Sequence, residues 1–236
     1  MNNNKKILET LKSRLYKKDS VHAFWLEGSL ADKDSDEYSD LDIWLSVDDD
    51  KIRSIHKEIE QILETINPID FRFVLKPTGE LGHNVYHLRG MSEFLTIDIN
   101  TQKLSRAIML TEDIDLYEII FDKSNIVRTK SRVQIEFNKA TELVELMKFI
   151  DYTALSVRKN DKRGKKMEAR EYYRNILVHV LEYLRKKNGI HEKVDFGFKH
   201  TYKDIPEDEA NKLEDFYFSN VTDGTIESLK SWLNSV

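Results

Sequence analysis

Two aspartates that lie two residues apart, Asp40 and Asp42, have a type and a spacing that can do chemistry. They begin the segment DLDIWLSV (40–47), whose alternating pattern predicts a strand, and side chains two apart on a strand share a face. Two carboxylates held side by side repel each other unless a cation compensates them. Mg²⁺ prefers a site of one or two carboxylates that water and phosphate oxygens complete. The pair therefore predicts a magnesium site.

A third acid lies in the segment FLTIDIN (94–100), which also alternates apolar and polar residues. The alternation puts Asp98 on one face with Thr96 and Asn100, and an acid among β-branched residues in mid-strand is unusual. A two-metal phosphoryl-transfer site requires three carboxylates on adjacent strands, because one metal activates the attacking oxygen and the other holds the triphosphate. Asp98 therefore completes a predicted site for two Mg²⁺ ions.

A glycine-serine pair, Gly28-Ser29, follows the strand-like run VHAFWLEG (21–28) and is separated from Asp40 by ten residues. A glycine lets a phosphate group approach the backbone closely, and a serine hydroxyl can hydrogen-bond to that group. The turn is weak evidence by itself. In combination with the three acids it predicts a phosphate-binding turn beside a metal site.

The elements that must position these residues occupy the first half of the chain. Apolar residues at helical spacing predict helices, and strict alternation predicts strands. The acids Asp48, Asp49 and Asp50 offer an N-cap and first-turn charges for the second helix. The expected order is a helix near 3–18, strands at 21–28 and 40–47, a helix near 52–66, and strands at 69–76, 84–88 and 94–100. This half therefore reads as a mixed α/β sheet domain of residues 1–128.

The second half, residues 129–236, has a different pattern, and the boundary falls near 125–132. Apolar residues keep helical spacing from Phe137 to Val157, and a second long helix is expected near 166–188, with Gly189 just past its end. Two shorter helices are expected to open at Pro206 and at Thr225, which would act as a cap. The second half therefore reads as an all-α helical bundle.

Composition excludes several classes of protein. The chain has 236 residues, of which 33% are charged and 40% hydrophobic, so a folded globule rather than a disordered or low-complexity chain is expected. There is no Cys, which excludes disulfides, Cys-zinc sites and thiol nucleophiles. The apolar runs are too short for a membrane span, and the Lys-rich start does not resemble a signal peptide. We expect a cytoplasmic protein without a membrane partner.

Charge is distributed unevenly along the chain. The formal net charge is −5, and the acidic excess lies in residues 1–130, whereas residues 158–187 are strongly basic. An overall acidic chain is a poor long-range binder of nucleic acid, since phosphate neutralisation supplies most non-specific affinity. We therefore do not expect a nucleic-acid partner, and a small anionic ligand fits the basic segment better.

The pattern of Gly28-Ser29, ten residues, then Asp40-Leu41-Asp42-Ile43, with an acid on a later strand, resembles the nucleotidyltransferases of the DNA polymerase beta superfamily. A sheet domain followed by a helical domain resembles, within that superfamily, the antibiotic nucleotidyltransferases. The segments 119–127 and 162–185 look most like the lincosamide type. The motif covers about 30 residues, whereas the layout covers most of the chain.

The resemblance implies a Mg²⁺-dependent enzyme that transfers AMP from ATP to a hydroxyl of a small molecule such as an aminoglycoside or lincosamide, with pyrophosphate leaving. It implies antibiotic resistance as the role and a homodimer as a fitting assembly. Carried over by position, it makes Asp40 and Asp42 metal ligands and makes Gly28 and Ser29 triphosphate-binding residues. Asp98 becomes the third acid, as metal ligand, general base or both.

Basic side chains are needed to stabilise a departing pyrophosphate. Lys166, Arg170 and Arg174 recur every four residues on one predicted helix and are the candidates for this role. The acidic first domain would suit a cationic acceptor.

Two rival interpretations come from other classes of protein. Arg174 and His179 on the second long helix resemble the Arg-x4-6-His signature of HEPN ribonucleases, whose bundles are often encoded beside a minimal nucleotidyltransferase antitoxin. The first rival is therefore a HEPN-like ribonuclease or a nucleotidyltransferase-type antitoxin of a toxin-antitoxin system. The alternative for these two residues is a surface arginine and a half-buried histidine without catalytic function. A nucleotidyltransferase fold that binds nucleotide without chemistry, as a regulatory module, is the other rival, and the three acids argue against it.

Two further pairs of residues have a structural interpretation. His83 and His87 are four apart, but the glycines around them predict strand and turn, so we reject a zinc site. Trp25 and Trp44 flank the proposed site and could stack on a base, although packing in the core is the favoured interpretation.

Overall fold

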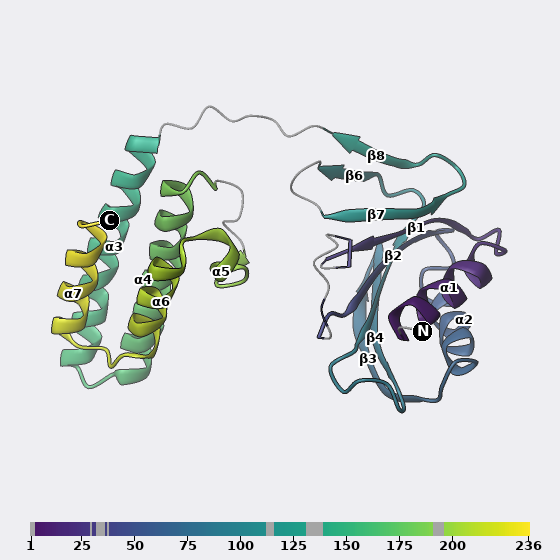
Figure 1. Ribbon diagram of the computed structural model, residues 1–236, viewed down its shortest axis with the longest axis horizontal. Coiled ribbons are helices and arrows are strands. Elements are labelled where there is room, and N and C mark those ends of the chain that lie inside the picture. The colour runs from purple at the N-terminus through teal and green to yellow at the C-terminus, as the bar shows by residue number, and fades with distance from the viewer. Residues whose placement is uncertain are drawn as a thin grey trace. The chain divides into compact units, whose positions relative to one another are not determined.

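The computed structural model describes residues 3–28, 30–31, 36, 38–111, 116–130, 139–190 and 196–236. The chain divides into two compact units, Met1–Val133 and Gln134–Val236. The first is a mixed α/β sheet unit and the second is helical (Figure 1). The predicted fold class is therefore confirmed. Over the described residues, no helix combines the length and the apolar character that crossing a membrane demands.

The sheet of the first unit has the strand order β3-β4-β5-β2-β1-β7. Only its two middle strands, β2 and β5, run parallel, whereas the neighbouring pairs are antiparallel. The strands that carry the predicted acids are thus central and immobilised on both sides. The bounds of the strands are β1 Val21–Glu27, β2 Leu41–Val47, β3 Ile69–Thr78, β4 Leu81–Leu88, β5 Ile97–Lys103 and β7 Tyr117–Asp122.

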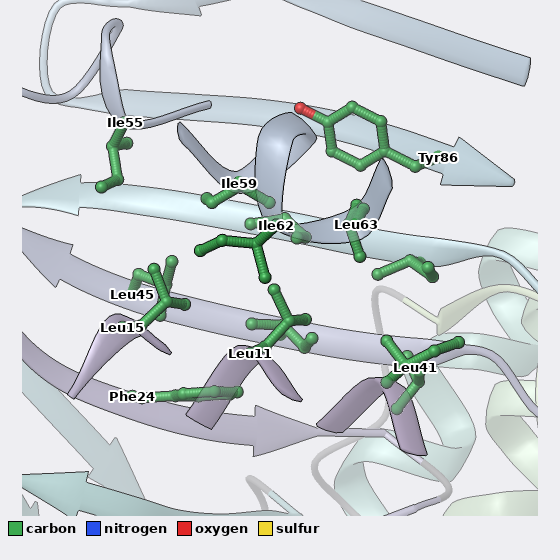
Figure 2. Packing of buried hydrophobic residues seen from close by; sticks show 14 of the residues in the cluster. Leu11, Leu15, Phe24, Leu41, Leu45, Ile55, Ile59, Ile62, Leu63 and Tyr86 are labelled. Carbon is green, nitrogen blue, oxygen red and sulfur yellow. The ribbon is translucent and has the colours of Figure 1, made fainter. Parts of the chain in front are cut away.

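Two helices, α1 (Asn3–Leu15) and α2 (Ile55–Glu64), cover one face of this sheet (Figure 1). Their apolar residues recur at helical spacing and meet the inward-facing residues of the strands, as Figure 2 shows. Figure 2 labels the helix residues Leu11, Leu15, Ile55, Ile59, Ile62 and Leu63 and the strand residues Phe24, Leu41, Leu45 and Tyr86. The second helix begins later than expected, because Ser54 rather than an aspartate precedes it.

The opposite face is partly covered by a small parallel pair of strands, β6 (Ile108–Thr111) and β8 (Val127–Lys130). Their apolar residues pack against Trp25, which is buried and stacks on Trp44 with ring centroids 5.7 Å apart. The favoured prediction that Trp25 packs in the core is therefore confirmed. The sequence analysis did not anticipate β6, β7 or β8.

The second unit is built on two long helices, α3 (Lys139–Lys162) and α4 (Lys166–Lys187). Three shorter helices complete what is described of it: α5 Thr201–Asp204, α6 Glu207–Phe218 and α7 Asp223–Leu233. Pro206 precedes α6 as predicted, but the cap expected at Thr225 was wrong. Thr222 is the N-cap of α7, and its side-chain oxygen accepts a hydrogen bond from the backbone N–H of Thr225.

Candidate functional site

Three carboxylates lie side by side across the middle of the sheet. Asp42 of β2 is in register with Asp98 of β5 on one side and with Glu27 of β1 on the other. Registered residues of neighbouring strands point to the same face, and all three are half-buried on the face opposite α1 and α2. We call Glu27, Asp42 and Asp98 the acid row. Like charges this close need a positive partner, so the row is suited to a cation.

Asp40 lies just before β2 and extends the acid row by one pleat. One of its carboxylate oxygens, Oδ1, accepts hydrogen bonds from the backbone N–H of Thr96 at 2.9 Å and from the Thr96 hydroxyl at 2.7 Å. Thr96 is two residues before Asp98, as Asp40 is two residues before Asp42. The predicted pair of aspartates is thus held on one face, with its second member in the acid row.

Gly28 directly follows β1 beside the acid row, in a backbone conformation with φ +75° that favours glycine. A Cβ atom built there would lie 3.2 Å from Cγ of Asp42 and closer still to its Oδ2 oxygen. The main chain therefore passes directly against the Asp42 carboxylate, and no side chain fits between them. A group bound at Asp42 can approach this stretch of backbone, as the sequence analysis expected for a phosphate.

Asp98 is contacted by one side chain of its own strand and by one of the neighbouring strand β4. Its Oδ1 oxygen accepts a hydrogen bond of 3.1 Å from the Asn100 amide and lies 2.5 Å from Nε2 of His83 on β4. Burial raises the pKa of the Asp98 carboxyl, the His83 and Asn100 contacts oppose this shift, and the negative charge of Asp40 adds to it. The pKa of Asp98 therefore depends on both the carboxylate of Asp40 and the imidazole of His83.

The donor set suits magnesium, since it consists of carboxylate oxygens on rigid strands, with the Gly28 main chain directly beside one of them. Within the described ranges, however, no three His, Asp or Glu side chains are gathered closely enough to hold a metal ion as they stand. The reason lies in their contacts, because Asp40 is turned to Thr96, and Asp98 to His83 and Asn100. The acids share a face, and rotation of their side chains is needed to make them converge.

A buried polar cluster lies on the helix-covered side of the same strands. Nε2 of His56 on α2 is 3.1 Å from the hydroxyl oxygen of Thr101 on β5. Burial, with a smaller contribution from His83, lowers the pKa of His56 to about 4. The imidazole is therefore neutral at ordinary pH, so His56 brings no positive charge to this side of the sheet.

Arg170, a predicted phosphate ligand, lies on α4 in the helical unit. Its guanidinium donates hydrogen bonds to the carbonyl oxygens of Ser219 at 2.7 Å and of Tyr217 at 2.6 Å. These carbonyls belong to the C-terminal end of α6 and the turn after it, so Arg170 joins two helices. Its role toward pyrophosphate stays a prediction, in competition with this structural one.

The other predicted basic residues of α4 are exposed. Lys166 lies 2.5 Å from Asp161, and Arg174 lies 3.4 Å from Glu171. His179 forms a 2.8 Å hydrogen bond with the carbonyl oxygen of Asn175. Each of these side chains thus has a neighbour within its own unit.

The ring of His179 stacks on Phe149 of α3, with centroids 4.2 Å apart. Arg174 is exposed and His179 half-buried, as the alternative without catalytic function proposed. The ribonuclease interpretation therefore gains no specific support from these residues. Ser29, the remaining predicted ligand, lies outside the described residues.

Two residues of this site were missed from sequence, Glu27 and His83. The alternation of VHAFWLEG already places Glu27 on the face of Trp25, whose indole N–H donates to it at 2.9 Å. This alternation is the sequence signal that identifies Glu27. His83 was considered only as a zinc ligand, and its approach to Asp98 depends on which strands are neighbours, which the sequence does not state.

Part of the first unit is similar to a known family of domains. Residues 5–89 match the family model described as "Nucleotidyltransferase domain". No curated protein matches the chain. Two solved structures from Helicobacter pylori are similar, a candidate nucleotidyltransferase and the protein JHP933. The first is 13% identical, with coverage of 99% of this chain and 96% of that chain and a TM-score of 0.30. The second is 10% identical, with coverage of 99% and 93% and a TM-score of 0.31.

The segment matched by the family model contains the first part of the site. Gly28, Asp40 and Asp42 lie inside residues 5–89, and Asp98 follows the matched segment. The strand register connects Asp98 to the matched segment, because it sets Asp98 directly beside Asp42. The chain thus carries a nucleotidyltransferase domain match over the glycine turn and the first two acids, and its fold supplies a third acid next to them.

Proposed function

We propose that the sheet unit transfers a nucleoside monophosphate, AMP in the first instance, from a nucleoside triphosphate to a hydroxyl group of a small molecule. The observation that carries this proposal is the register of Asp42 with Asp98 beside the close approach of Gly28. This arrangement offers carboxylates for divalent cations and bare backbone for phosphate groups. The match of residues 5–89 to the nucleotidyltransferase domain supports the same reaction class.

In the proposed reaction, Asp40, Asp42 and Asp98 hold Mg²⁺, and Gly28 with Ser29 receives the triphosphate. The metal ions supply charge neutralisation for the phosphate oxygens. The acceptor hydroxyl oxygen forms a bond to the α-phosphorus, the bond from that phosphorus to the bridging oxygen breaks, and pyrophosphate leaves. The hydroxyl proton passes to Asp98 directly or through water. Most of the rate enhancement then comes from positioning and electrostatic stabilisation.

Asp98 is the best placed of the acids to accept this proton. Burial raises the pKa of its carboxyl, which makes it a better base than an exposed aspartate. The His83 imidazole of β4 and the Asn100 amide of β5 fix the direction of the carboxylate. An acceptor that approaches Asp98 therefore finds a base of defined orientation, while Asp42 lies toward the phosphates.

The first test is transfer from ATP labelled at the α-phosphorus, with Mg²⁺ and a panel of acceptors that includes aminoglycosides and lincosamides. We expect labelled acceptor and released pyrophosphate. Asp42→Asn should lower the rate by at least about a thousandfold, because it removes a charge that neutralises the transferring group. Asp50→Asn is the matched control, since Asp50 is an exposed aspartate of the same unit. Unchanged transfer by Asp42→Asn would contradict the proposal.

A second test does not depend on the acceptor. Calorimetry with α,β-methylene-ATP should show binding that requires Mg²⁺ or Mn²⁺ and that is lost in Asp42→Asn but kept in Asp50→Asn. Binding without metal, or equal binding by both variants, would favour a different function. Binding without any transfer over a wide panel would favour the regulatory interpretation.

A further inference from the structure

The acid row continues across the sheet as an apolar surface. Val85 of β4 is in register with Asp98, and Phe73 of β3 is in register with Val85. Phe71 and Leu75 stand two residues to either side of Phe73 and so share its face. We call Phe71, Phe73, Leu75 and Val85 the apolar platform. It begins at the residue next to Asp98 and ends at the edge strand of the sheet.

The orientation of the platform follows from its neighbours on β3. Arg72 lies 3.2 Å from Glu60 of α2, so its side chain points to the helix-covered face. Phe71 and Phe73, on either side of it, therefore point to the opposite face, which is that of Asp98. The register of Val85 with both Phe73 and Asp98 assigns the platform to this same face.

The platform is exposed although its residues are apolar. The exposed fractions of Phe71, Phe73 and Leu75 are 53%, 54% and 36%. Edge strands are normally protected by charge or by covering segments, and a continuous apolar patch on a protein surface commonly marks a binding site. Each aromatic side chain that is covered by a ligand removes a large apolar area from water.

We propose that the apolar platform binds the apolar or aromatic body of the acceptor, whose hydroxyl group then lies at Asp98. This inference rests on the proposed function, and it names the acceptor class: a hydroxyl compound with an aromatic or aliphatic ring system. Adjacent strands lie about 4.8 Å apart, so from β5 to β3 the platform accommodates a body of about 10 Å. The acceptor body thus spans the platform from Asp98 to the edge strand.

The direction of attack argues for this side of the acid row. The Gly28 backbone lies against Asp42, so the triphosphate belongs at the β1 and β2 end of the row. In-line displacement requires the attacking hydroxyl and the departing pyrophosphate on opposite sides of the α-phosphorus. The acceptor therefore approaches from the Asp98 end. At the β1 end of the acid row, the same face is already covered, because β6 and β8 pack on Trp25.

The borders of the platform are polar. His87 is in register with Phe71, and His83 is in register with Leu75. Both ring nitrogens of His87 already have partners, the Asp70 carboxylate at 2.6 Å and the Ser92 carbonyl oxygen at 3.0 Å. His83, which contacts Asp98, is therefore the histidine that borders the hydroxyl end of the acceptor. An acceptor with both an apolar body and polar substituents fits this arrangement better than one that is polar throughout.

The test uses the full chain with Mg²⁺, α,β-methylene-ATP and 2-naphthylethanol, a probe with an aromatic body and one hydroxyl. Two valines of the same hairpin report on the two faces, since Val74 is exposed on the face opposite Val85. In methyl NMR spectra, titration with the probe should shift the Val85 signals to saturation and leave the Val74 signals in place. Glycerol, which lacks an apolar body, should shift neither.

Variants test which side chains bind the probe. Phe73→Ala should weaken probe binding by at least about tenfold, because the covered aromatic ring is lost. Val74→Ala, on the same strand and equally exposed, should leave the probe dissociation constant within about twofold of wild type. Both positions are exposed, so both variants should fold. The proposal is overturned if the Val85 signals do not shift, or if Phe73→Ala and wild type bind the probe equally.

Replacement of Mg²⁺ by Mn²⁺ tests where the hydroxyl end lies. Paramagnetic relaxation should broaden the hydroxymethyl protons of the probe more than its ring protons. A Val85 shift without this difference overturns the acceptor role. Calorimetry with the nucleotide analogue separates the two proposals: nucleotide binding without probe binding refutes the platform alone, whereas loss of metal-dependent nucleotide binding refutes the proposed function. If Phe73→Ala instead converts a dimer into a monomer in light scattering, the platform is an interface between copies and the proposal fails.

Discussion

The two faces of strands β2 and β5 have opposite properties, although they are formed by alternate residues of the same segments. On the face toward α1 and α2, Leu41, Ile43 and Ile99 are completely buried, in the hydrophobic core that Figure 2 shows. On the other face, Asp42 and Asp98 stand half-exposed beside each other. One face is therefore packed in the hydrophobic core, and the other carries the carboxylates of the proposed site.

This difference explains how repelling carboxylates are kept together. The apolar residues before and after each acid anchor the backbone, and burial of a large aliphatic side chain contributes about 1.5–3 kcal/mol. The strands consequently hold Asp42 and Asp98 in register whatever the acids contribute themselves. Substitutions on the first face should change stability, and substitutions on the second should change activity.

The largest expected effect on stability is at Ile43, which lies directly after Asp42 and is completely buried. Ile43→Ala should lower the free energy of unfolding by about 2–5 kcal/mol, because a cavity replaces packed side-chain atoms. Urea unfolding measures this change. Nucleotidyl transfer by the folded protein should stay within about twofold of wild type. Loss of transfer in protein shown to be folded would contradict the division between the faces.

His56 should make the helix-covered face sensitive to acid. Its pKa is lowered to about 4 by burial, while the unfolded chain takes up a proton near pH 6.5. Between these values the unfolded state binds more protons, so stability is complete above about pH 6.5 and falls as the pH drops toward 4. The loss amounts to about 3 kcal/mol. Urea unfolding at several pH values should show a weaker acid dependence in His56→Gln.

His87 is the matched control for this pH experiment because its shift has the opposite sign. A hydrogen bond with Asp70 raises the pKa of His87. Its contribution to stability is therefore present below pH 6.5 and lost as the pH rises through the folded-state value. His87→Gln should destabilise the protein mainly at low pH. Equal pH profiles for the His56→Gln and His87→Gln variants would contradict the assigned environments.

Substitution of Gly28 tests the face that carries Asp42 and Asp98. Gly28→Ala should lower transfer by about a hundredfold, since its Cβ atom displaces the Asp42 carboxylate and small displacements of this kind are costly. Gly90→Ala is the control: Gly90 also has a positive φ, but a Cβ atom there lies 3.7 Å from its nearest neighbour, the Asn67 amide. Both variants should lose similar stability, and only the first should lose activity. Steady-state kinetics and thermal unfolding measure the two effects.

The smallest expected effect concerns the ion pair between Arg72 and Glu60 at the border of the helix-covered face. The Arg72 side chain is largely exposed. Arg72→Ala should lower the free energy of unfolding by less than about 1 kcal/mol, and the effect should shrink as salt is added. A loss comparable to that of Ile43→Ala would show that charge rather than apolar burial stabilises this face.

Much of the sheet unit could be predicted from sequence because its strands alternate strictly and its helices are amphipathic. The same alternation predicted that Asp42 and Asp98 lie on polar faces. The strands β6 and β8 escaped prediction because four-residue segments are too short to show a period. The contact of His83 with Asp98 escaped for another reason: the order of strands in a sheet is a property of the assembled fold, and periodicity within one strand carries no information about it.

The parallel pairing of β2 with β5 has a consequence for the folding of the chain during synthesis. Between Asp42 and Asp98 the polypeptide runs through α2, β3 and β4, and antiparallel contacts of β4 with β5 close the path. Contacts between segments so distant along the chain form slowly, because a long loop must be closed first. A ribosome-bound chain that has not yet released β5 thus holds two of the carboxylates without the third. The proposed metal site is therefore complete only when that strand has docked beside β2.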